Sequence, residues 1–157
     1  MSDANMVISY VETDEECVEL HKFLCVISQP QLFAPIDAQD SMEEVLRVRD
    51  EGASLVVKID NEIVGALGIV PVGWWYNKKE QFLADRWFFV YPQFHHKGIS
   101  ATLLAEASAI AHKAGLPLII TGKKRIKRLS NGTNFVLPEV ITEENELCAS
   151  EMRRLSK

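Results

Sequence analysis

The residues best suited to binding a charged ligand lie close together in one turn, from His95 to Ala101. An apolar run ends before this turn at Val90, and a helical pattern of apolar residues opens after Gly98. The first turn of a helix carries free N–H groups and the positive end of the helix dipole, both of which favour phosphate. Gly98 has no side chain to keep a ligand away from the backbone. The turn therefore predicts a phosphate or pyrophosphate site.

The other side chains of the turn suit the same ligand. Ser100 and Ala101 are small enough to leave neighbouring amides open, and Ser100 also offers a hydroxyl donor. Lys97 adds a positive charge. His95 and His96 can titrate near neutral pH, and we expect them to position the backbone or to contact phosphate. The competing interpretation is a strand-to-helix turn in another α/β protein, where the glycine serves only tight packing.

A strand and a helix must hold this turn in place. Residues 82–90 are mostly large and apolar, which predicts a strand. From Ile99 an apolar stripe of helical spacing continues to Ala114, and Gly115 follows where the C-terminus of a helix prefers glycine. Residues 116–121 form a second apolar run. Strand, helix and strand in this order predict a parallel βαβ unit with a right-handed crossover.

The N-terminal part of the chain predicts a strand and two helices. Residues 6–11 favour a strand. Thr13 and Glu16 have the spacing of a capping box, which predicts a helix with Thr13 as its N-cap. The same logic makes Ser41 the expected N-cap of a second helix, which Gly52 closes.

Beyond that helix the pattern changes to strands. Apolar runs at 55–59 and 63–70 flank a short polar turn, which is typical of a hairpin. Residues 71–77 contain proline and glycine and predict a loop. That loop carries three aromatic residues, which would line an acceptor pocket, plug the end of the sheet or form a homodimer contact: Trp74, Trp75 and Tyr76.

The C-terminal part is less regular. We expect a short helix at 123–129, a strand at 135–137 and a final helix after Thr142. Five of the six residues at 123–128 are basic. They form either a solvated helix face or a contact for a coenzyme phosphate or an acidic partner.

The strand and the turn after it resemble the acyl-CoA-binding motif of the GNAT superfamily of N-acyltransferases. In that motif a hydrophobic strand and V-x-P precede R/Q-x-x-G-x-G/A, which opens a helix. Val90-Tyr91-Pro92 and Gly98 match this pattern, and the spacing is preserved. The departures are His95, where Arg or Gln is usual, and Ser100, where Gly or Ala is usual.

The resemblance extends over residues 6–121, about three quarters of the chain, and residues 122–157 diverge. Within it, residues 60–66 resemble the family's D-G-x-x-V-G hairpin. The resemblance implies one GNAT-like domain over 1–157. It also implies an α/β fold with a central mixed sheet, a splayed parallel strand pair and flanking helices.

The resemblance further implies that acetyl-CoA is the cosubstrate and that no metal is needed. The pantetheine arm would pair with the backbone of Phe89 and Val90, because a strand with unpaired backbone groups can pair with a ligand. The turn from His95 to Ala101 would hold the pyrophosphate.

Acyl transfer to an amine needs a base for the amine and an acid for the leaving thiolate. Asp85 is the one acid in the predicted strand before the turn, so it is the candidate catalytic base, acting directly or through water. The alternative is an ion pair with Arg86 or another basic residue. The alternation of side chains along a strand also opposes the catalytic role. Family bases commonly lie an even number of residues before the Val90 position, whereas Asp85 lies an odd number before it. Only a β-bulge would turn Asp85 to the right face.

The acid that the resemblance implies, a tyrosine after the second parallel strand, has no counterpart, because every tyrosine precedes that strand. Water, Ser130 or Tyr76 would have to protonate the thiolate. The leading function is transfer of an acetyl group from acetyl-CoA to a primary amine of an unidentified acceptor, by direct attack in a ternary complex. The alternative is an acyl-CoA-binding or interaction module that has lost the chemistry. An unrelated nucleotide-phosphate binder is the third possibility.

Composition limits the other classes of function. A net charge of −5 opposes a general nucleic-acid binder, and no apolar run approaches the ~20 residues that span a membrane. Cys17, Cys25 and Cys148 form no Cys-x-x-Cys pair, which opposes a zinc site or a disulfide framework. The first five residues lack the character of a signal peptide. We therefore expect a reduced, cytoplasmic protein.

Overall fold

The computed structural model describes residues 6–32, 34–120, 126–128, 134–136 and 139–140. The chain divides into two compact units. The first combines the residues up to Val70 with Arg86–Ala105, and the second combines Pro71–Asp85 with the chain from Glu106 onward. Whether the chain acts as one domain stays a prediction.

The first unit is built on a sheet of long antiparallel strands. β1 pairs with β2, and β2 pairs with β3, both antiparallel. β4 follows β3 as a hydrogen-bonded neighbour, so the order is β1-β2-β3-β4. The bounds of the strands are Met6–Tyr10 for β1, Ala53–Ile59 for β2, Glu62–Trp74 for β3 and Asn77–Val90 for β4.

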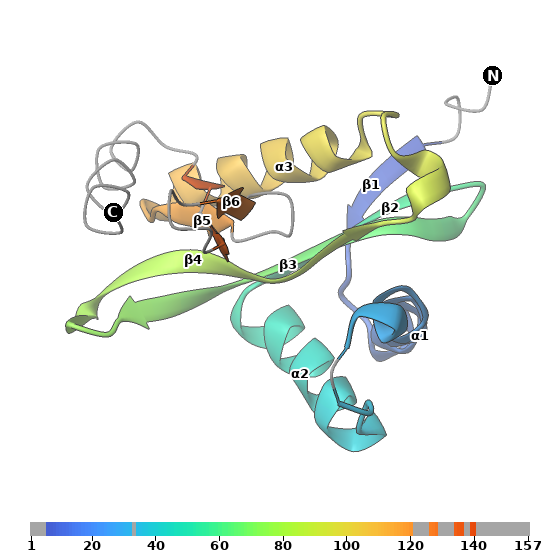
Figure 1. Ribbon diagram of the computed structural model, residues 1–157, viewed down its shortest axis with the longest axis horizontal. Coiled ribbons are helices and arrows are strands. Elements are labelled where there is room, and N and C mark those ends of the chain that lie inside the picture. Colours follow the sequence, from blue (N-terminus) through green and yellow to red (C-terminus); the bar gives the residue numbers. More distant parts are fainter. Residues whose placement is uncertain (1–5, 33, 121–125, 129–133, 137–138, 141–157) are drawn as a thin grey trace. The chain divides into compact units, whose positions relative to one another are not determined.

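Three helices accompany this sheet. α1 (Asp14–Ser28) and α2 (Ala38–Glu51) cover one face, and α3 (Ile99–Ala114) begins on the opposite face (Figure 1). Two short 3₁₀ turns, η2 (Gln29–Gln31) and η3 (Pro92–Phe94), follow α1 and β4.

The core of the first unit fills both faces of the sheet. Leu20 and Val48 come from α1 and α2, Leu55 and Leu67 from the strands, and all four are fully buried. Leu103, from the part of α3 that belongs to this unit, is also fully buried. Burial of one such aliphatic side chain is worth roughly 1.5–3 kcal/mol, so this packing holds the strands and helices in register.

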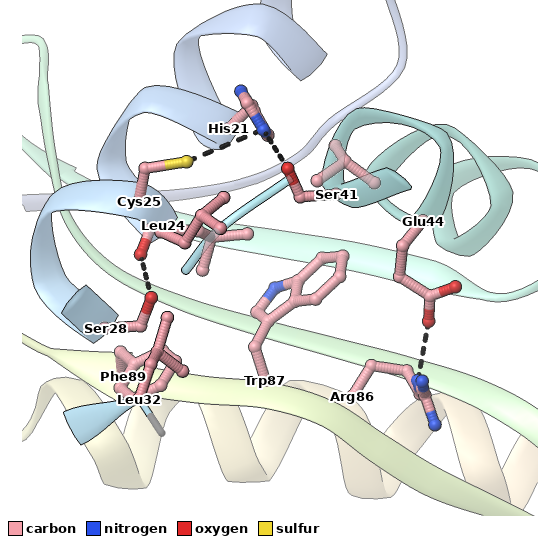
Figure 2. Close-up of a pocket in the computed structure, with 12 residues that line it drawn as sticks. His21, Leu24, Cys25, Ser28, Leu32, Ser41, Glu44, Arg86, Trp87 and Phe89 are labelled. Carbon is pink, nitrogen blue, oxygen red and sulfur yellow. Dashed lines mark hydrogen bonds and ion pairs between the residues drawn. The ribbon is translucent and has the colours of Figure 1, made fainter. Parts of the chain in front are cut away.

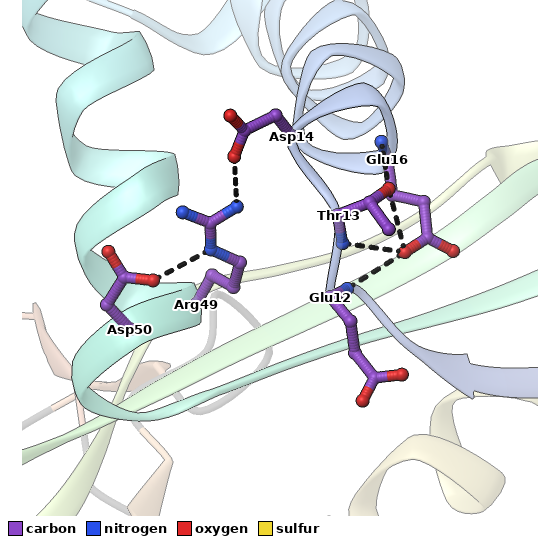
Figure 3. Close-up of polar contacts among 6 residues, drawn as sticks. All are labelled: Glu12, Thr13, Asp14, Glu16, Arg49 and Asp50. Carbon is purple, nitrogen blue, oxygen red and sulfur yellow. Dashed lines mark hydrogen bonds and ion pairs between the residues drawn. The ribbon is translucent and has the colours of Figure 1, made fainter.

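The predicted capping box at the start of α1 is confirmed (Figure 3). The Thr13 hydroxyl accepts the N–H of Glu16 at 3.1 Å, and the Glu16 carboxylate accepts the N–H groups of Thr13 and Glu12, both at 2.9 Å. These backbone hydrogen bonds, the one from Thr13 first, hold the pKa of Glu16 below its usual value. The helix therefore begins where the sequence predicts.

Arg49 joins the end of α2 to the start of α1 (Figure 3). Its guanidinium lies 2.5 Å from Asp14 and 2.8 Å from Asp50. Both carboxylates are well exposed, and an exposed ion pair contributes only about 0–1 kcal/mol. The pair therefore orients the two helix ends more than it stabilises them.

The predicted N-cap of α2 is wrong. The helix begins at Ala38, and Asp37 is its N-cap, with its side chain accepting the N–H of Asp40 at 2.9 Å. Ser41 lies inside the first turn, where its hydroxyl donates to the carbonyl of Asp37 at 2.8 Å. Gly52 closes the helix as predicted, and its N–H donates to Val48.

The hairpin between β2 and β3 is confirmed. Its two turn residues, Asp60 and Asn61, have φ values of 51° and 68°. Two successive left-handed residues are typical of the type I′ turn that joins twisted antiparallel strands. Asp and Asn adopt this conformation more readily than other residues with side chains.

The loop predicted at 71–77 is wrong, because strands occupy most of it. β3 continues to Trp74, and β4 begins at Asn77. Trp74 packs against Phe82 with ring centroids 4.2 Å apart, as aromatic pairs on adjacent strands do. A Cβ on Gly73 would lie 2.9 Å from the carbonyl oxygen of Lys78, so glycine permits this close pairing. At the tip, Trp75 is 86% exposed.

The second unit contains the predicted parallel strand pair. β5 (Leu118–Ile120) runs parallel to β4, with Leu83 opposite Leu118 and Ala84 opposite Ile119. β8 (Glu139–Val140) pairs antiparallel with β5. The full strand order is β1-β2-β3-β4-β5-β8, so the sheet is mixed, as expected.

The helix predicted at 123–129 is wrong where the structure describes it. Residues 126–128 form β6 (Ile126–Arg128), which pairs antiparallel with β7 (Asn134–Val136). β7 confirms the described part of the strand predicted at 135–137. The helix predicted after Thr142 lies outside the described residues. No helix in the described ranges is both long and apolar enough to cross a membrane.

Candidate functional site

The predicted turn lies between β4 and α3. β4 ends at Val90, η3 follows, and α3 begins at Ile99. The N–H of Tyr91 donates to the carbonyl of Val64 in β3 at 2.9 Å, which fixes the end of β4 to its neighbour. The strand and the helix that the turn requires are therefore both present.

His95 ties the turn back to the end of β4. In a trans peptide the C=O and N–H groups point in opposite directions, so the Val90 carbonyl points away from the side on which Tyr91 bonds β3. His95 Nε2 lies 3.1 Å from that carbonyl oxygen. A carbonyl only accepts, so Nε2 carries the proton and donates. In this structure His95 thus positions backbone.

Gly98 gives the turn its open surface. Its φ is +80°, in the left-handed region that favours glycine, and no atom of the described residues lies within 4 Å of the position that a Cβ would take. His96, with φ of 70°, also lies in the left-handed region. Lys97 and Ala101 are exposed beside Gly98, and Ser100 is half-buried. A ligand can therefore reach the backbone at this point.

At the same place, the start of α3 presents N–H groups that have no acceptor within the helix. The first helical bond runs from the N–H of Thr102 to the carbonyl of Gly98, at 3.0 Å. The N–H groups of residues 99–101 precede it, so α3 itself offers them no acceptor. Three amides at the positive end of a helix dipole suit a phosphate.

Gly65 supports this site from β3, a role that the sequence alone does not indicate. A Cβ there would lie 2.8 Å from Ile99 Cγ2 and 3.3 Å from Val90 Cγ2. The glycine therefore lets β3 support the end of β4 and the start of α3 together. The signal was present, because Gly65 is the last glycine of the hairpin motif, but its contact partners were not predictable from spacing.

A cavity of about 280 Å³ lies on the opposite face of the sheet, between α1, α2 and β4 (Figure 2). Phe89 links the two places, because its side chain lines the cavity while its backbone belongs to the end of β4. The cavity was not predicted. The residues that line it are His21, Leu24, Cys25, Ser28, Leu32, Ile36, Ser41, Glu44, Val45, Arg86, Trp87 and Phe89.

Two arginines bind Glu44 at one side of this cavity, and Figure 2 shows the bond from Arg86. Arg47 lies 2.9 Å from its carboxylate, and Arg86 donates to it through Nε at 2.6 Å. These hydrogen bonds, the one from Arg47 first, hold the pKa of Glu44 below its usual value. Glu44 is thus an ionised acid whose charge is already balanced.

His21 lies between Ser41 and Cys25. The hydrogen bonds of Ser41 determine whether His21 Nε2 donates or accepts. Ser41 Oγ donates to the Asp37 carbonyl, so toward His21 it acts as an acceptor. His21 Nε2, 2.7 Å from Ser41 Oγ, must then carry a proton. The same Nε2 lies 3.5 Å from Cys25 Sγ and has no free lone pair to deprotonate it. This cluster is therefore not a Cys–His nucleophile.

Trp87 forms part of the cavity wall with an unused donor. Its side chain is 8% exposed, and within the described part of the chain its Nε1 has no hydrogen-bond partner. The indole lies over Gly68, where a Cβ would come within 2.4 Å of the ring. Gly68 therefore makes room for this indole.

Asp85, the candidate base, belongs to the second unit. It is half-buried and engaged with a neighbouring group. Arg86, one expected partner, instead bonds Glu44. The described residues contain no cluster of side chains that could hold a metal ion.

One comparison with known proteins identifies a family. The acetyltransferase (GNAT) family model matches residues 15–124. Among curated proteins, none matches this chain by sequence.

Several solved structures have the same fold. A GNAT family acetyltransferase from Brucella melitensis, in complex with acetyl-CoA, has 19% identity and a TM-score of 0.60, covering 88% of this chain and 96% of that one. An aminoglycoside acetyltransferase from an uncultured soil metagenomic sample, in complex with trehalose, has 14% identity and a TM-score of 0.60. The match covers 79% of this chain and 82% of that one. A ribosomal-protein-alanine N-acetyltransferase from Brucella melitensis biovar Abortus 2308 has 14% identity and a TM-score of 0.59, covering 80% and 82%. With the family match over most of its length, this chain belongs to the acetyltransferase (GNAT) family.

Proposed function

We propose that the protein transfers an acetyl group from acetyl-CoA to a primary amine. The observation that carries this proposal is the turn at Gly98, where a left-handed glycine leaves open space beside three amides without helical acceptors. This arrangement suits a pyrophosphate, and membership of an acetyltransferase family supports assigning that pyrophosphate to coenzyme A. The similar Brucella structure was solved with acetyl-CoA.

The coenzyme would lie along the end of β4. The pantetheine arm carries amides, and it would pair with the backbone of Phe89 and Val90. The Val90 carbonyl already accepts from His95, but a carbonyl oxygen has two lone pairs and can accept a second hydrogen bond. The pyrophosphate would then contact the turn from His95 to Ala101.

Direct attack by the amine is the mechanism we propose, because the described cysteines are poor nucleophiles. Cys17 is fully buried, and burial raises the pKa of its thiol. Cys25 lies beside a histidine nitrogen that donates rather than accepts. The amine nitrogen would form the new C–N bond as the C–S bond breaks and the thiolate leaves.

Proton transfer would use Asp85 and water. Asp85 is the proposed base for the amine, directly or through water. The thiolate would take its proton from water, because the chain has no tyrosine after Tyr91. This missing tyrosine is also the observation that favours the second candidate function, a binding module for acyl-CoA without turnover.

One experiment tests the proposed function. The protein is incubated with acetyl-CoA and a panel of amino acids, peptides, polyamines and aminoglycosides, and free thiol is followed with time. We expect at least one amine to raise thiol release well above hydrolysis, with the acetylated amine detected by mass spectrometry. Binding of acetyl-CoA without transfer to any amine would support the binding module instead.

A further inference from the structure

The cavity between α1, α2 and β4 has the size and lining of a site for a small, largely apolar molecule. Its volume of about 280 Å³ lies just below the ~300–1,000 Å³ of pockets that hold drug-sized ligands. The apolar wall comes from α1, the segment that follows it, α2 and β4. Its members are Leu24, Leu32, Ile36, Val45, Trp87 and Phe89.

The unpaired donors of one arginine at the cavity favour a ligand that carries a carboxylate. Among the described residues that line the cavity, Glu44 is the one acid, and Arg47 and Arg86 already bind it. Arg86 is 47% exposed and uses only Nε, so within the described part of the chain both of its terminal nitrogens lack a partner. A guanidinium fixed through Nε presents those nitrogens as a fork that matches a carboxylate.

We propose that this cavity holds the acceptor and that the acceptor is a free apolar α-amino acid. This proposal rests on the acetyl-transfer function. Its carboxylate pairs with Arg86, and its side chain packs against Leu24 and Phe89. Its neutral amine attacks the thioester carbonyl carbon. The C–N bond forms, the C–S bond breaks, the amine proton passes to water, and the products are an N-acetyl amino acid and coenzyme A.

The same features disfavour a polycationic acceptor. An aminoglycoside needs unpaired carboxylates to replace the water around its several ammonium groups. The one acid among the described residues that line the cavity, Glu44, is already paired with Arg47 and Arg86, so it offers no unpaired carboxylate to an ammonium group. The acetyl transfer to aminoglycosides by structurally similar proteins is therefore not expected here.

Binding of three matched amines tests this inference without turnover. The probes are leucine, leucinamide and 3-methylbutylamine, which share one apolar side chain but differ in the carboxylate. Their dissociation constants are measured by ligand-observed NMR, with and without acetyl-CoA. We expect leucine to bind about tenfold more tightly than the two probes without a carboxylate, as a charge-assisted pair predicts.

Two arginine variants locate the effect. Arg86→Gln keeps a donor for Glu44 but removes the two terminal nitrogens. It should raise the dissociation constant of leucine about tenfold and change that of leucinamide less than twofold. Arg86→Lys should recover part of the loss. Arg47→Gln is the matched control, because Arg47 also binds Glu44 but does not line the cavity, and it should leave both probes unchanged.

The outcomes separate this inference from the proposed function. Equal binding of leucine and leucinamide, or equal loss in the two glutamine variants, would overturn the amino-acid assignment. So would acetyl transfer to peptides or aminoglycosides with none to apolar amino acids. If leucine binds through Arg86 but no thiol is released, the cavity assignment stands and the acetyltransferase function fails.

Discussion

At the residue scale, the open left-handed turn at Gly98 was predictable and the cavity was not. Gly98 lies between a strand and a helix, where a residue without a side chain indicates a left-handed turn or a ligand close to the backbone. The pair of Glu44 and Arg86 joins residues that are 42 positions apart, and no periodicity connects them. His21 and Ser41 meet in the same way across 20 positions. Contacts of this kind depend on how α1 and α2 pack, which a single sequence does not specify.

The first prediction concerns Gly98 and uses Gly115 as its control. Both glycines have positive φ, +80° and +70°, and both have open space where a Cβ would be. A side chain at either position carries a similar backbone strain, of order 1–3 kcal/mol. Only Gly98→Trp would also fill the proposed phosphate site, so it alone should abolish acetyl-CoA binding in calorimetry.

His95→Ala completes this comparison. It removes the bond to the Val90 carbonyl but leaves the amides of α3 in place. We therefore expect binding to weaken only a few-fold. Retained binding in Gly98→Trp together with lost binding in His95→Ala would show that the histidine, not the helix N-terminus, anchors the coenzyme.

At the element scale, local chemistry predicted most boundaries and failed where two signals competed. Ser41 and Glu44 have capping-box spacing, but Glu44 is held by arginines and Asp37 caps the helix four residues earlier. Ala38 adds a residue with high helix propensity to that earlier start. In the loop predicted at 71–77, proline and glycine suggested that the strand ends. Cross-strand packing of Trp74 on Phe82 instead extends the hairpin.

The second prediction tests the capping box of α1. Thr13→Ala should lower the free energy of unfolding by about 1 kcal/mol, because the N–H of Glu16 loses its acceptor. Glu16 also makes stability depend on pH. Its pKa is lowered in the folded state, so the unfolded chain binds more protons and the stabilisation is lost as the pH falls through the folded pKa.

Thermal melts in acid separate this contribution from other carboxylates. Between roughly pH 5 and pH 3, Glu16→Gln should lose less stability than the unmodified protein, because the titrating group is gone. Glu15→Gln removes the same charge from the first turn of α1 without touching the capping contacts, so it should follow the unmodified protein. An identical acid response in all three would contradict the assignment of this effect to Glu16.

At the scale of the whole molecule, family membership and the mixed sheet were predictable from one motif and the order of elements. The parallel pairing of β4 with β5 was expected from the strand–helix–strand pattern and from that resemblance, and it is confirmed. The proposed acceptor could not be predicted from the sequence, because it is inferred from a cavity assembled from α1, α2 and β4. The strand at residues 126–128 was not predicted. Five of the six residues at 123–128 are basic, and such a run resembles the solvated face of a helix.

The third prediction is that acetyl-CoA stabilises the fold. A ligand present at 100 times its dissociation constant adds about 2.7 kcal/mol to the free energy of unfolding. For a chain of this size the melting temperature should rise by roughly 5–10 °C. Coenzyme A should give most of this shift, since the phosphates and pantetheine arm make the proposed contacts. No shift at millimolar acetyl-CoA in a folded sample would contradict coenzyme binding.

The last prediction concerns the pH dependence of turnover and the role of Asp85. Only a neutral amine is nucleophilic, so the rate of thiol release should rise with pH until the acceptor amine has lost its proton. If Asp85 takes that proton, Asp85→Asn should lower kcat by about 10²-fold, the low end for general base catalysis. The deficit should shrink at high pH, where hydroxide and the already neutral amine make a base unnecessary. Glu80→Gln is the control, because Glu80 is an exposed acid of the same strand, and it should leave kcat unchanged. An unchanged kcat in Asp85→Asn, with normal acetyl-CoA binding, would make this carboxylate structural and would leave proton removal to water alone.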